Sequence, residues 1–214
     1  MTILGRRILL ATTNPAKLER LAWLLKGLGM ELLRPADLKL EPSVAEEGPS
    51  HRAIAELKAG AWSQAAGILA IASDGGVSIP ALGDAWDSRL THRFTSPGLN
   101  DIQRAQRLLE LMRPYRGSAR RIFWTEAVAI ADQGRLLWSW ETAGAEGVLA
   151  EDLSQNPGIP GFWVAGLWHF PALGKLYTEL TQTELDTLGD HWSRLRSQVR
   201  AFLSGATGEQ PQSG

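Results

Sequence analysis

The stretch that decides the fold is ILLATTNPAKLE, residues 8–19. It joins a short apolar run, Ile8–Ala11, to a polar turn at Thr12–Asn14 and to the start of a helix at Pro15. This order predicts a buried strand followed by a helix. The free N–H groups and the dipole at a helix N-terminus favour an anion, and Lys17 adds a positive charge there. Thr, Asn and Pro are also common at this position for capping alone, so the stretch indicates either a capped turn or an anion site.

A second strand and a second helix follow along the chain. Glu31–Pro35 predicts a strand, so the first unit is strand, helix, strand. Ser50 predicts the cap of a helix that runs to about Ala66 and stops at Gly67. The alternation of strands and helices indicates the α/β class.

A short apolar strand, Ile68–Ala72, is predicted to end at the polar sequence Ser73-Asp74-Gly75-Gly76. In open α/β sheets, ligands gather beyond the carboxyl ends of the strands, so an acid followed by two glycines indicates a binding site here. The alternative is that Asp74-Gly75 is only a turn.

The second half of the chain predicts one helix, a hairpin and two further helices. In chain order these are a helix from Asn100 or Asp101 to Met112, strands at Arg120–Ala131 and Arg135–Glu141 joined by Asp132-Gln133-Gly134, a bend at Gly144 and Gly147, a helix with the capping pair Thr181 and Glu184, and a last helix capped by Asp190. Residues 204–214 hold no core-forming side chains, so we expect a disordered tail there.

Composition limits the classes of protein that remain. The chain has 214 residues, 44% of them hydrophobic and 21% charged, which predicts a packed core rather than disorder. A net charge of −1 argues against nucleic acid as the main partner. The chain has no cysteine, which excludes disulfides and thiolate metal sites. No charged and apolar leader and no membrane-length apolar run are found, so we expect a cytoplasmic protein with no membrane partner.

Four short motifs occur in a fixed order along the chain. They are Thr12-Thr13-Asn14-Pro15-Ala16-Lys17; Glu46-Glu47-Gly48-Pro49-Ser50 followed by Lys58-Ala59; Ala72-Ser73-Asp74-Gly75-Gly76-Val77 followed by Ala81-Leu82-Gly83; and Gly174-Lys175-Leu176-Tyr177-Thr178-Glu179-Leu180. In this order and spacing the chain resembles the inosine triphosphate pyrophosphatase family, the non-standard purine nucleoside triphosphate pyrophosphatases. The resemblance runs over nearly the whole chain, from about Ile8 to Leu203.

The resemblance implies a fold and a reaction. The implied fold is a single α/β domain over residues 1–203, an elongated mixed β-sheet flanked by helices, with two lobes and a central cleft. The implied reaction is magnesium-dependent hydrolysis of a nucleoside triphosphate to the monophosphate and pyrophosphate, by a homodimer that takes part in nucleotide metabolism. Acids that hold magnesium and lysines that hold phosphates suit this chemistry, because water must attack a highly charged phosphorus centre.

The resemblance also assigns residues to roles. Asp74 and Lys17 are the implied catalytic residues, and Glu46 and Asp74 are the implied metal ligands, with Glu47 as the alternative to Glu46 if the register is shifted by one. The implied substrate-binding residues are Thr12, Thr13, Asn14, Lys17, Lys58, Gly75, Phe162, Trp163, Lys175, His191 and Trp192. Lys58 and Lys175 also have plain structural explanations, as a solvated helix lysine and as the cap of a turn.

The departures from the family pattern concern the acids and the base end. Ser73 stands where the family has the first of two Asp residues. The segment Gly161-Phe162-Trp163-Val164-Ala165-Gly166 has Ala165 in place of the family's Asp, and Trp192 replaces an Arg after His191. Because an unmatched buried hydrogen-bonding group costs roughly 1–3 kcal/mol, losing both groups predicts an altered or relaxed base preference. Two alternatives remain: a catalytically weak nucleotide-binding protein, and a scaffold whose tryptophans serve assembly.

Overall fold

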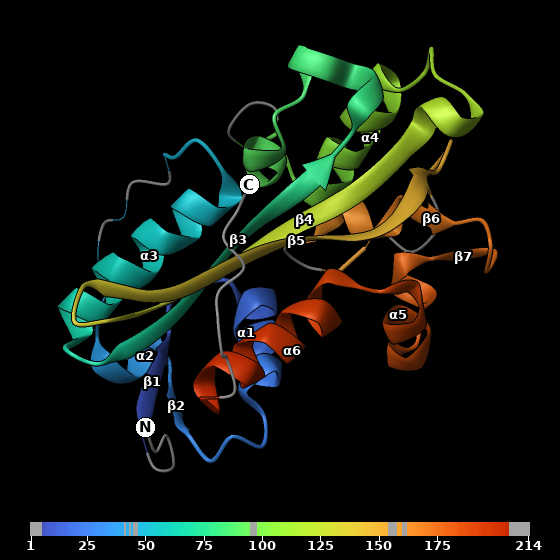
Figure 1. Ribbon diagram of the computed structural model, residues 1–214. Helices are drawn as coiled ribbons and strands as arrows, with labels where there is room; N and C mark the ends of the chain where they lie inside the picture. The colour runs from blue at the N-terminus through green and yellow to red at the C-terminus, as the bar shows by residue number, and fades with distance from the viewer. Residues whose placement is uncertain are drawn as a thin grey trace, which may run out of the picture. The chain divides into compact units, whose positions relative to one another are not determined.

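The computed structural model of the chain describes residues 6–40, 42, 44, 47–94, 98–153, 158–159 and 162–205 (Figure 1). The described residues divide into two compact units. Unit 1 draws on Met1–Asp74, Ala127–Thr142 and Trp192–Gly214, and unit 2 on Gly75–Glu126 and Ala143–His191. The two-lobed domain with a central cleft stays a prediction, and most of the predicted tail, residues 206–214, lies outside the described residues.

The described residues form a mixed seven-stranded sheet and six α-helices, which confirms the α/β class. The strands are β1 (Arg7–Leu10), β2 (Glu31–Leu33), β3 (Leu69–Ser78), β4 (Arg121–Asp132), β5 (Arg135–Leu149), β6 (Trp168–Phe170) and β7 (Lys175–Leu176). The α-helices are α1 (Pro15–Leu25), α2 (Pro35–Leu38), α3 (His51–Ala66), α4 (Asp101–Leu111), α5 (Gln182–Leu188) and α6 (His191–Leu203). The short 3-10 helices are η1 (Pro80–Ala85), η2 (Ser88–Arg93), η3 (Gly117–Arg120), η4 (Trp163–Gly166) and η5 (Tyr177–Glu179).

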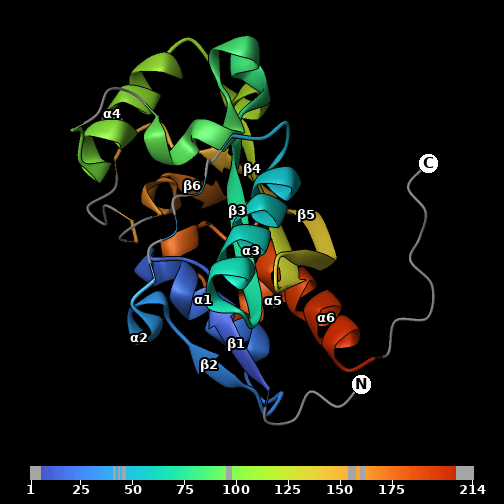
Figure 2. The same cartoon turned by 90° about the vertical axis from the view of Figure 1, so that its left-hand side faces the viewer.

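The strand order in the sheet is β2-β1-β3-β4-β5-β6-β7. Strand β1 pairs in parallel with β2 and with β3, whereas β6 runs antiparallel to both β5 and β7. Figure 2 shows β1 and β2 side by side in blue. The carboxyl end of β1 therefore lies next to β3, the strand that carries Asp74. None of the α-helices that the described residues form is both long and apolar enough to cross a membrane.

Two apolar clusters, one on each side of the strands, form the core of unit 1. Alternate residues such as Ile8 and Ile71 pack with α1 and α6, whereas Leu9 and Ala72 pack with α3. This alternation is expected, because successive side chains of a strand point to opposite faces of the sheet. Figure 1 shows α3 on one side of these strands and α1 and α6 on the other.

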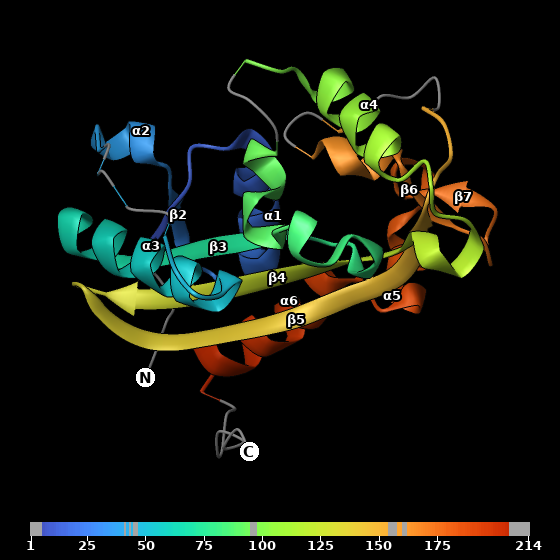
Figure 3. The same ribbon diagram turned by 90° about the horizontal axis from the view of Figure 1, so that it is seen from above.

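Local signals in the sequence correctly predicted several element ends. The Ser50 hydroxyl accepts a hydrogen bond from the Ala53 N–H at 3.1 Å, and Gly67 ends α3 in the left-handed conformation. Gln133 and Gly134 have φ angles of 48° and 83°, which a two-residue hairpin turn of type I′ requires. Figure 3 shows the long β4–β5 hairpin that this turn closes.

Two predictions that a strand ends or bends at glycines are wrong. Strand β3 does not end at Ser73-Asp74-Gly75-Gly76 but continues to Ser78. A Cβ atom on Gly75 would lie 2.0 Å from Oε2 of Glu126, and a Cβ on Gly76 would lie 1.8 Å from the carbonyl oxygen of Ser88. These glycines therefore allow close packing on a straight strand rather than a turn.

The same explanation applies to β5, which runs unbroken through the predicted bend to Leu149. A Cβ atom on Gly144 would lie 2.6 Å from Nδ1 of His191. A Cβ on Gly147 would lie 2.6 Å from both the His169 carbonyl oxygen and the Trp168 indole nitrogen. Glycine is needed at both positions because a neighbouring group occupies the space of a side chain.

Candidate functional site

The candidate site in unit 1 is built around the carboxylate of Asp74. Oxygen Oδ2 lies 2.7 Å from Nδ1 of His51, and Oδ1 accepts a hydrogen bond of 2.8 Å from Nζ of Lys58. His51 is buried, and the side chains of Asp74 and Lys58 are only 13% and 14% exposed. Both partners lie on α3, seven residues and two turns apart, so one face of the helix presents both groups to β3.

The turn between β1 and α1 brings Lys17 to the same place. Asn14 caps α1, since its side-chain oxygen accepts from the Lys17 N–H at 3.2 Å, and the Thr12 hydroxyl accepts from the Asn14 N–H at 3.2 Å. The Lys17 ammonium donates to the carbonyl oxygen of Ser73 at 3.3 Å. Thr13 is exposed. The structure thus joins the first motif to the third, and the capped-turn and anion-site interpretations of this stretch are compatible.

The charge of Asp74 follows from its surroundings. Burial alone would raise the pKa of this carboxyl, but the hydrogen bond from His51 and the positive charges of Lys17 and Lys58 outweigh burial and hold the pKa at about 2. The carboxylate is therefore ionised at neutral pH and is a weak base. This favours Asp74 as a group that orients or ligates over one that removes a proton from water.

The corner around Asp74 fits a magnesium ion that is bound by protein and phosphate oxygens together. The described residues contain no group of three metal-ligating side chains, Glu46 lies outside the described residues, and Glu47 is exposed. Proteins commonly bind magnesium through one or two carboxylates together with phosphate oxygens, and the ionised carboxylate of Asp74 fits such a role. The hydroxyl of Ser73 is buried and has no hydrogen-bond partner among the described residues.

His51 is the residue of this site that the sequence analysis missed. The available signal was spacing: His51 is the first residue of a capped helix and stands seven positions before Lys58, on the same face. The periodicity of apolar residues does not reveal such a polar pair.

Lys175, which lies in unit 2, is held by an acid on α5. Its ammonium donates to Oε1 of Glu184 at 2.6 Å, and this hydrogen bond, with two more from Thr181, lowers the pKa of Glu184 to about 2. Both side chains keep appreciable exposure, 38% for Lys175 and 27% for Glu184. Lys175 therefore sits at the surface of unit 2 with its charge already balanced by one carboxylate. Its role as a phosphate contact stays a prediction.

The predicted base-end residues are largely packing residues in this structure. Trp163 is 2% exposed, and its indole N–H donates to the Thr91 carbonyl oxygen at 3.2 Å. His191 is fully buried beside Asp190, and Trp192, which belongs to unit 1, is 5% exposed in the core. Stacking of a base on either tryptophan would require that side chain to leave its place in the core.

Phe162 is the predicted base-end residue that keeps partial exposure. It contacts Trp124 edge-to-face, with ring centroids 4.6 Å apart, and Trp124 in turn stacks on the His191 ring at 6.1 Å. The Trp124 indole N–H donates to Glu126 at 2.7 Å. Phe162 and Trp124 are both only partly buried, so the role of Phe162 as a contact of the base stays a prediction. Gly75 lies directly against Glu126, as described above.

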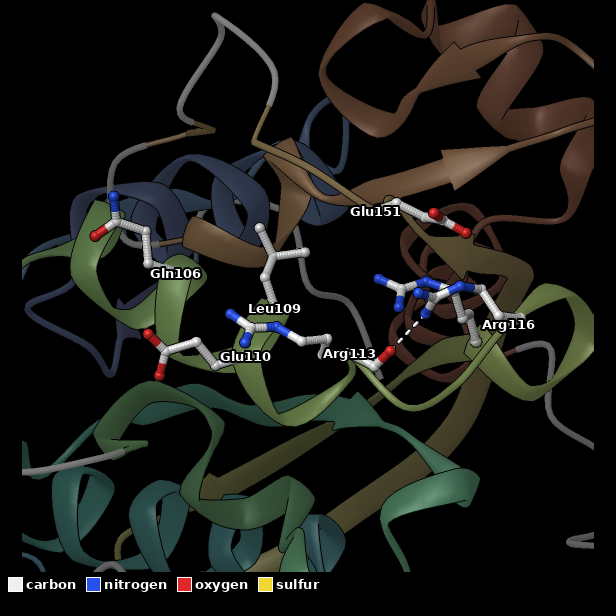
Figure 4. A pocket seen from close by; sticks show the side chains of 7 residues that line it. Gln106, Leu109, Glu110, Arg113, Arg116 and Glu151 are labelled. Atoms are coloured by element: carbon white, nitrogen blue, oxygen red, sulfur yellow. Dashed lines mark hydrogen bonds between the residues drawn. The ribbon is translucent and has the colours of Figure 1, made fainter.

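A separate pocket of about 520 Å³ lies in unit 2, apart from all of these residues (Figure 4). It is lined by Gln106, Leu109, Glu110, Arg113, Arg116, Arg120 and Glu151. Arg120 is buried and gives its N–H groups to the backbone carbonyls of Leu149, Met112 and Ala150 at 2.8, 2.8 and 2.5 Å. Its guanidinium therefore ties the end of α4 to the end of β5, which is a structural role.

The protein is thus a mixed α/β sheet in which Lys17 and Lys58 gather around Ser73 and Asp74, close to the carboxyl end of β1. Residues 8–184 match the model of the Ham1 family, and the chain belongs to that family. The resemblance inferred from the four motifs is thereby confirmed.

Related proteins carry the name dITP/XTP pyrophosphatase. One from Leptospira interrogans is 30% identical over 92% of this chain and 97% of its own length. One from Thermus thermophilus is 31% identical over 94% of both chains.

Solved structures show the same fold. A HAM1 protein from Coxiella burnetii superimposes with a TM-score of 0.77 at 23% identity, over 94% of this chain and 99% of its own. A nucleoside-triphosphatase, or dITP/XTP pyrophosphatase, from Mycobacterium abscessus superimposes with a TM-score of 0.67 at 25% identity, over 92% of this chain and 98% of its own.

Proposed function

We propose that this chain is a nucleoside triphosphate pyrophosphatase that hydrolyses a nucleoside triphosphate to the monophosphate and pyrophosphate. The observation that carries the proposal is the Asp74 corner, where one ionised carboxylate is held among Lys17, Lys58 and His51. Lys17 and Lys58 bring two ammonium groups to this corner, and ammonium groups attract the oxygens of a polyphosphate. The names of the relatives support the same reaction class.

The residues of the corner have distinct tasks in this reaction. Lys17 and Lys58 neutralise the negative charge of the phosphates, which lowers the barrier to attack by water on the α-phosphorus. Asp74 orients the attacking water and serves, with Glu46, as a ligand of magnesium. When bound, magnesium supplies Lewis-acid polarisation of the phosphate oxygens.

We propose an altered or relaxed base preference for this enzyme. The acid and the guanidinium that the family pattern places at the base end are replaced by Ala165 and Trp192, both of them buried. A site without those polar groups loses the penalty that it would impose on an unmatched base. Partly exposed aromatic rings such as Phe162 and Trp124 accept any base by stacking.

The proposal is tested by a substrate panel. The protein is incubated with magnesium and with standard or deaminated nucleoside triphosphates, and released pyrophosphate is measured. We expect release from several purine triphosphates with weak discrimination among them. The second candidate is a catalytically weak nucleotide-binding protein, which the replacement of an acid by Ser73 motivates. Nucleotide binding without release of pyrophosphate from any member of the panel would favour it.

The corner itself is tested by substitution. We expect Asp74→Asn and Lys17→Ala each to lower turnover by about 100-fold or more, since each removes a charge that acts on the transition state. Lys26→Ala is the matched control, because this lysine follows the other end of the same helix and is exposed. Near-wild-type turnover in either site variant would show that the reaction occurs elsewhere.

The resemblance to the family also leads us to propose a homodimer and a cytoplasmic location. Sedimentation equilibrium of the full chain tests the first, and a monomer at micromolar concentration would contradict it. Fractionation of the cells that make the protein tests the second.

A further inference from the structure

The start of α3 fixes the position of His51. Ser50 caps the helix through its hydrogen bond with the Ala53 N–H, so the backbone of His51 is held in the first helical turn. The imidazole is buried, with 4% exposure, and its Nδ1 lies 2.7 Å from Oδ2 of Asp74. An imidazole has only two side-chain torsions, so a buried ring on a capped helix is a rigid partner for the carboxylate.

The direction of the hydrogen bond follows from the charge of Asp74. A carboxylate accepts hydrogen bonds, and with Lys58 donating to Oδ1 the 2.7 Å contact at Oδ2 assigns the proton to Nδ1 of His51 as its donor. Lys58 donates to the other oxygen, Oδ1, from the same face of α3. Because each oxygen has its own donor, the plane of the carboxylate is fixed against rotation about the bond between Cβ and Cγ.

The two donors are not equivalent as holders of the carboxylate. Lys58 has a flexible four-carbon stem and an ammonium that triphosphate would also attract. When phosphates compete for Lys58, the donor that still fixes the carboxylate is His51. Ser73 stands in place of a second acid, so Asp74 is the acid that β3 supplies to this corner.

We propose that His51 is a positioning residue for the hydrolysis reaction, holding the Asp74 carboxylate through its Nδ1–H so that the remaining lone pairs face the substrate. This inference rests on the proposed function. It predicts that His51 acts on the rate of the chemical step rather than on binding of the nucleotide. Loss of the donor should lower kcat and leave KM nearly unchanged, because the lysines that attract the phosphates remain.

Two substitutions separate positioning from mere packing. His51→Phe keeps the ring and removes the donor, whereas His51→Asn keeps a donor nitrogen attached to Cγ, as Nδ1 is. We expect His51→Phe to lower kcat roughly 10–100-fold, as removal of a residue that orients a ligand typically does, and His51→Asn to recover kcat to within about threefold of wild type. His169→Asn is the control, since this half-buried histidine lies on β6 in unit 2, and we expect its kcat to be unchanged. A kcat for His51→Phe above half of the wild-type value, or equal losses in His51→Phe and His51→Asn, would overturn the proposal.

A second readout does not depend on turnover. In protein labelled with ¹⁵N-histidine, the long-range ¹H–¹⁵N spectrum of the wild type should show a protonated Nδ1 on His51, assigned by its loss in His51→Asn. Asp74→Ala should move this resonance by removing the acceptor. An unprotonated Nδ1 on His51 in the wild type would overturn the inference. If the wild type released no pyrophosphate, the proposed function would fail, while this spectrum would still decide whether His51 holds Asp74.

Discussion

Adding a single methyl group at Gly76 should destabilise the protein strongly. Gly76 lies on β3 in unit 2, and an ideal Cβ there would stand 1.8 Å from the carbonyl oxygen of Ser88 and 2.8 Å from Oγ1 of Thr91. The obstacle is backbone, which cannot rotate away as a long side chain can. The change Gly76→Ala therefore forces η2 and β3 apart.

The size of the effect follows from the contacts that hold η2 on β3. The carbonyl of Ser88 must retreat by about 1 Å, and overpacking of this kind typically costs about 1–3 kcal/mol. The Thr91 hydroxyl accepts from the Val77 N–H at 3.1 Å, and the same displacement breaks this hydrogen bond at a further cost of about 1 kcal/mol. We expect the free energy of unfolding to fall by about 3 kcal/mol.

The assay is urea unfolding of Gly76→Ala beside a matched glycine. Gly60 lies inside α3, and a Cβ there would meet nothing closer than the Gly134 carbonyl oxygen at 3.6 Å. Gly60→Ala should therefore stabilise the protein by up to about 1 kcal/mol, because alanine favours a helix interior. A Gly76→Ala protein within about 0.5 kcal/mol of wild type would refute the packing explanation.

Three further outcomes are expected. In metal-free buffer the lowered pKa of Asp74 stabilises the fold above about pH 4. About 2 kcal/mol of this stability is lost as the pH falls toward 2, because the unfolded state then binds the extra proton. In urea titrations the stability difference between wild type and Asp74→Asn should shrink by that amount, and a constant difference would contradict this. Arg120→Met should lower the free energy of unfolding by roughly 3 kcal/mol, because it leaves buried carbonyls without donors. Urea unfolding measures this change, and a loss below about 1 kcal/mol would argue against a structural role for Arg120. Lys175→Met should raise the pKa of Glu184 toward its ordinary value by removing the main hydrogen bond to it, and an unchanged NMR titration of Glu184 would show that Lys175 is not its partner.

Much of the fold could be predicted because its signals are local. The Ser50 cap and the Gln133-Gly134 turn depend on a few neighbouring residues and on backbone angles that only certain residues adopt. Three of the predicted site residues, which the structure brings close together, also had local signals. Lys17 stands at a capped helix start beyond a strand, and Lys58 and Asp74 belong to motifs that keep their order.

The errors have a common physical cause. A glycine pair after an acid favours a turn when only neighbours in sequence are considered, yet Gly75 and Gly76 are on a straight strand because Glu126 and Ser88 occupy the space of their side chains. Those contacts join positions far apart in the chain, so no window of sequence contains them. His51 was missed for a related reason, since its importance depends on an acid 23 residues away.

The amino-acid sequence by itself determined the α/β class, several element ends and the family, because caps, turns, periodicity and motif order are properties of short segments. Only the tertiary structure decided that Asp74 is hydrogen-bonded to both His51 and Lys58, and that Trp163 and Trp192 belong to the cores of their units. Burial and the charge of a carboxylate depend on which distant groups surround it, and that is set by the packing of α3 against β3.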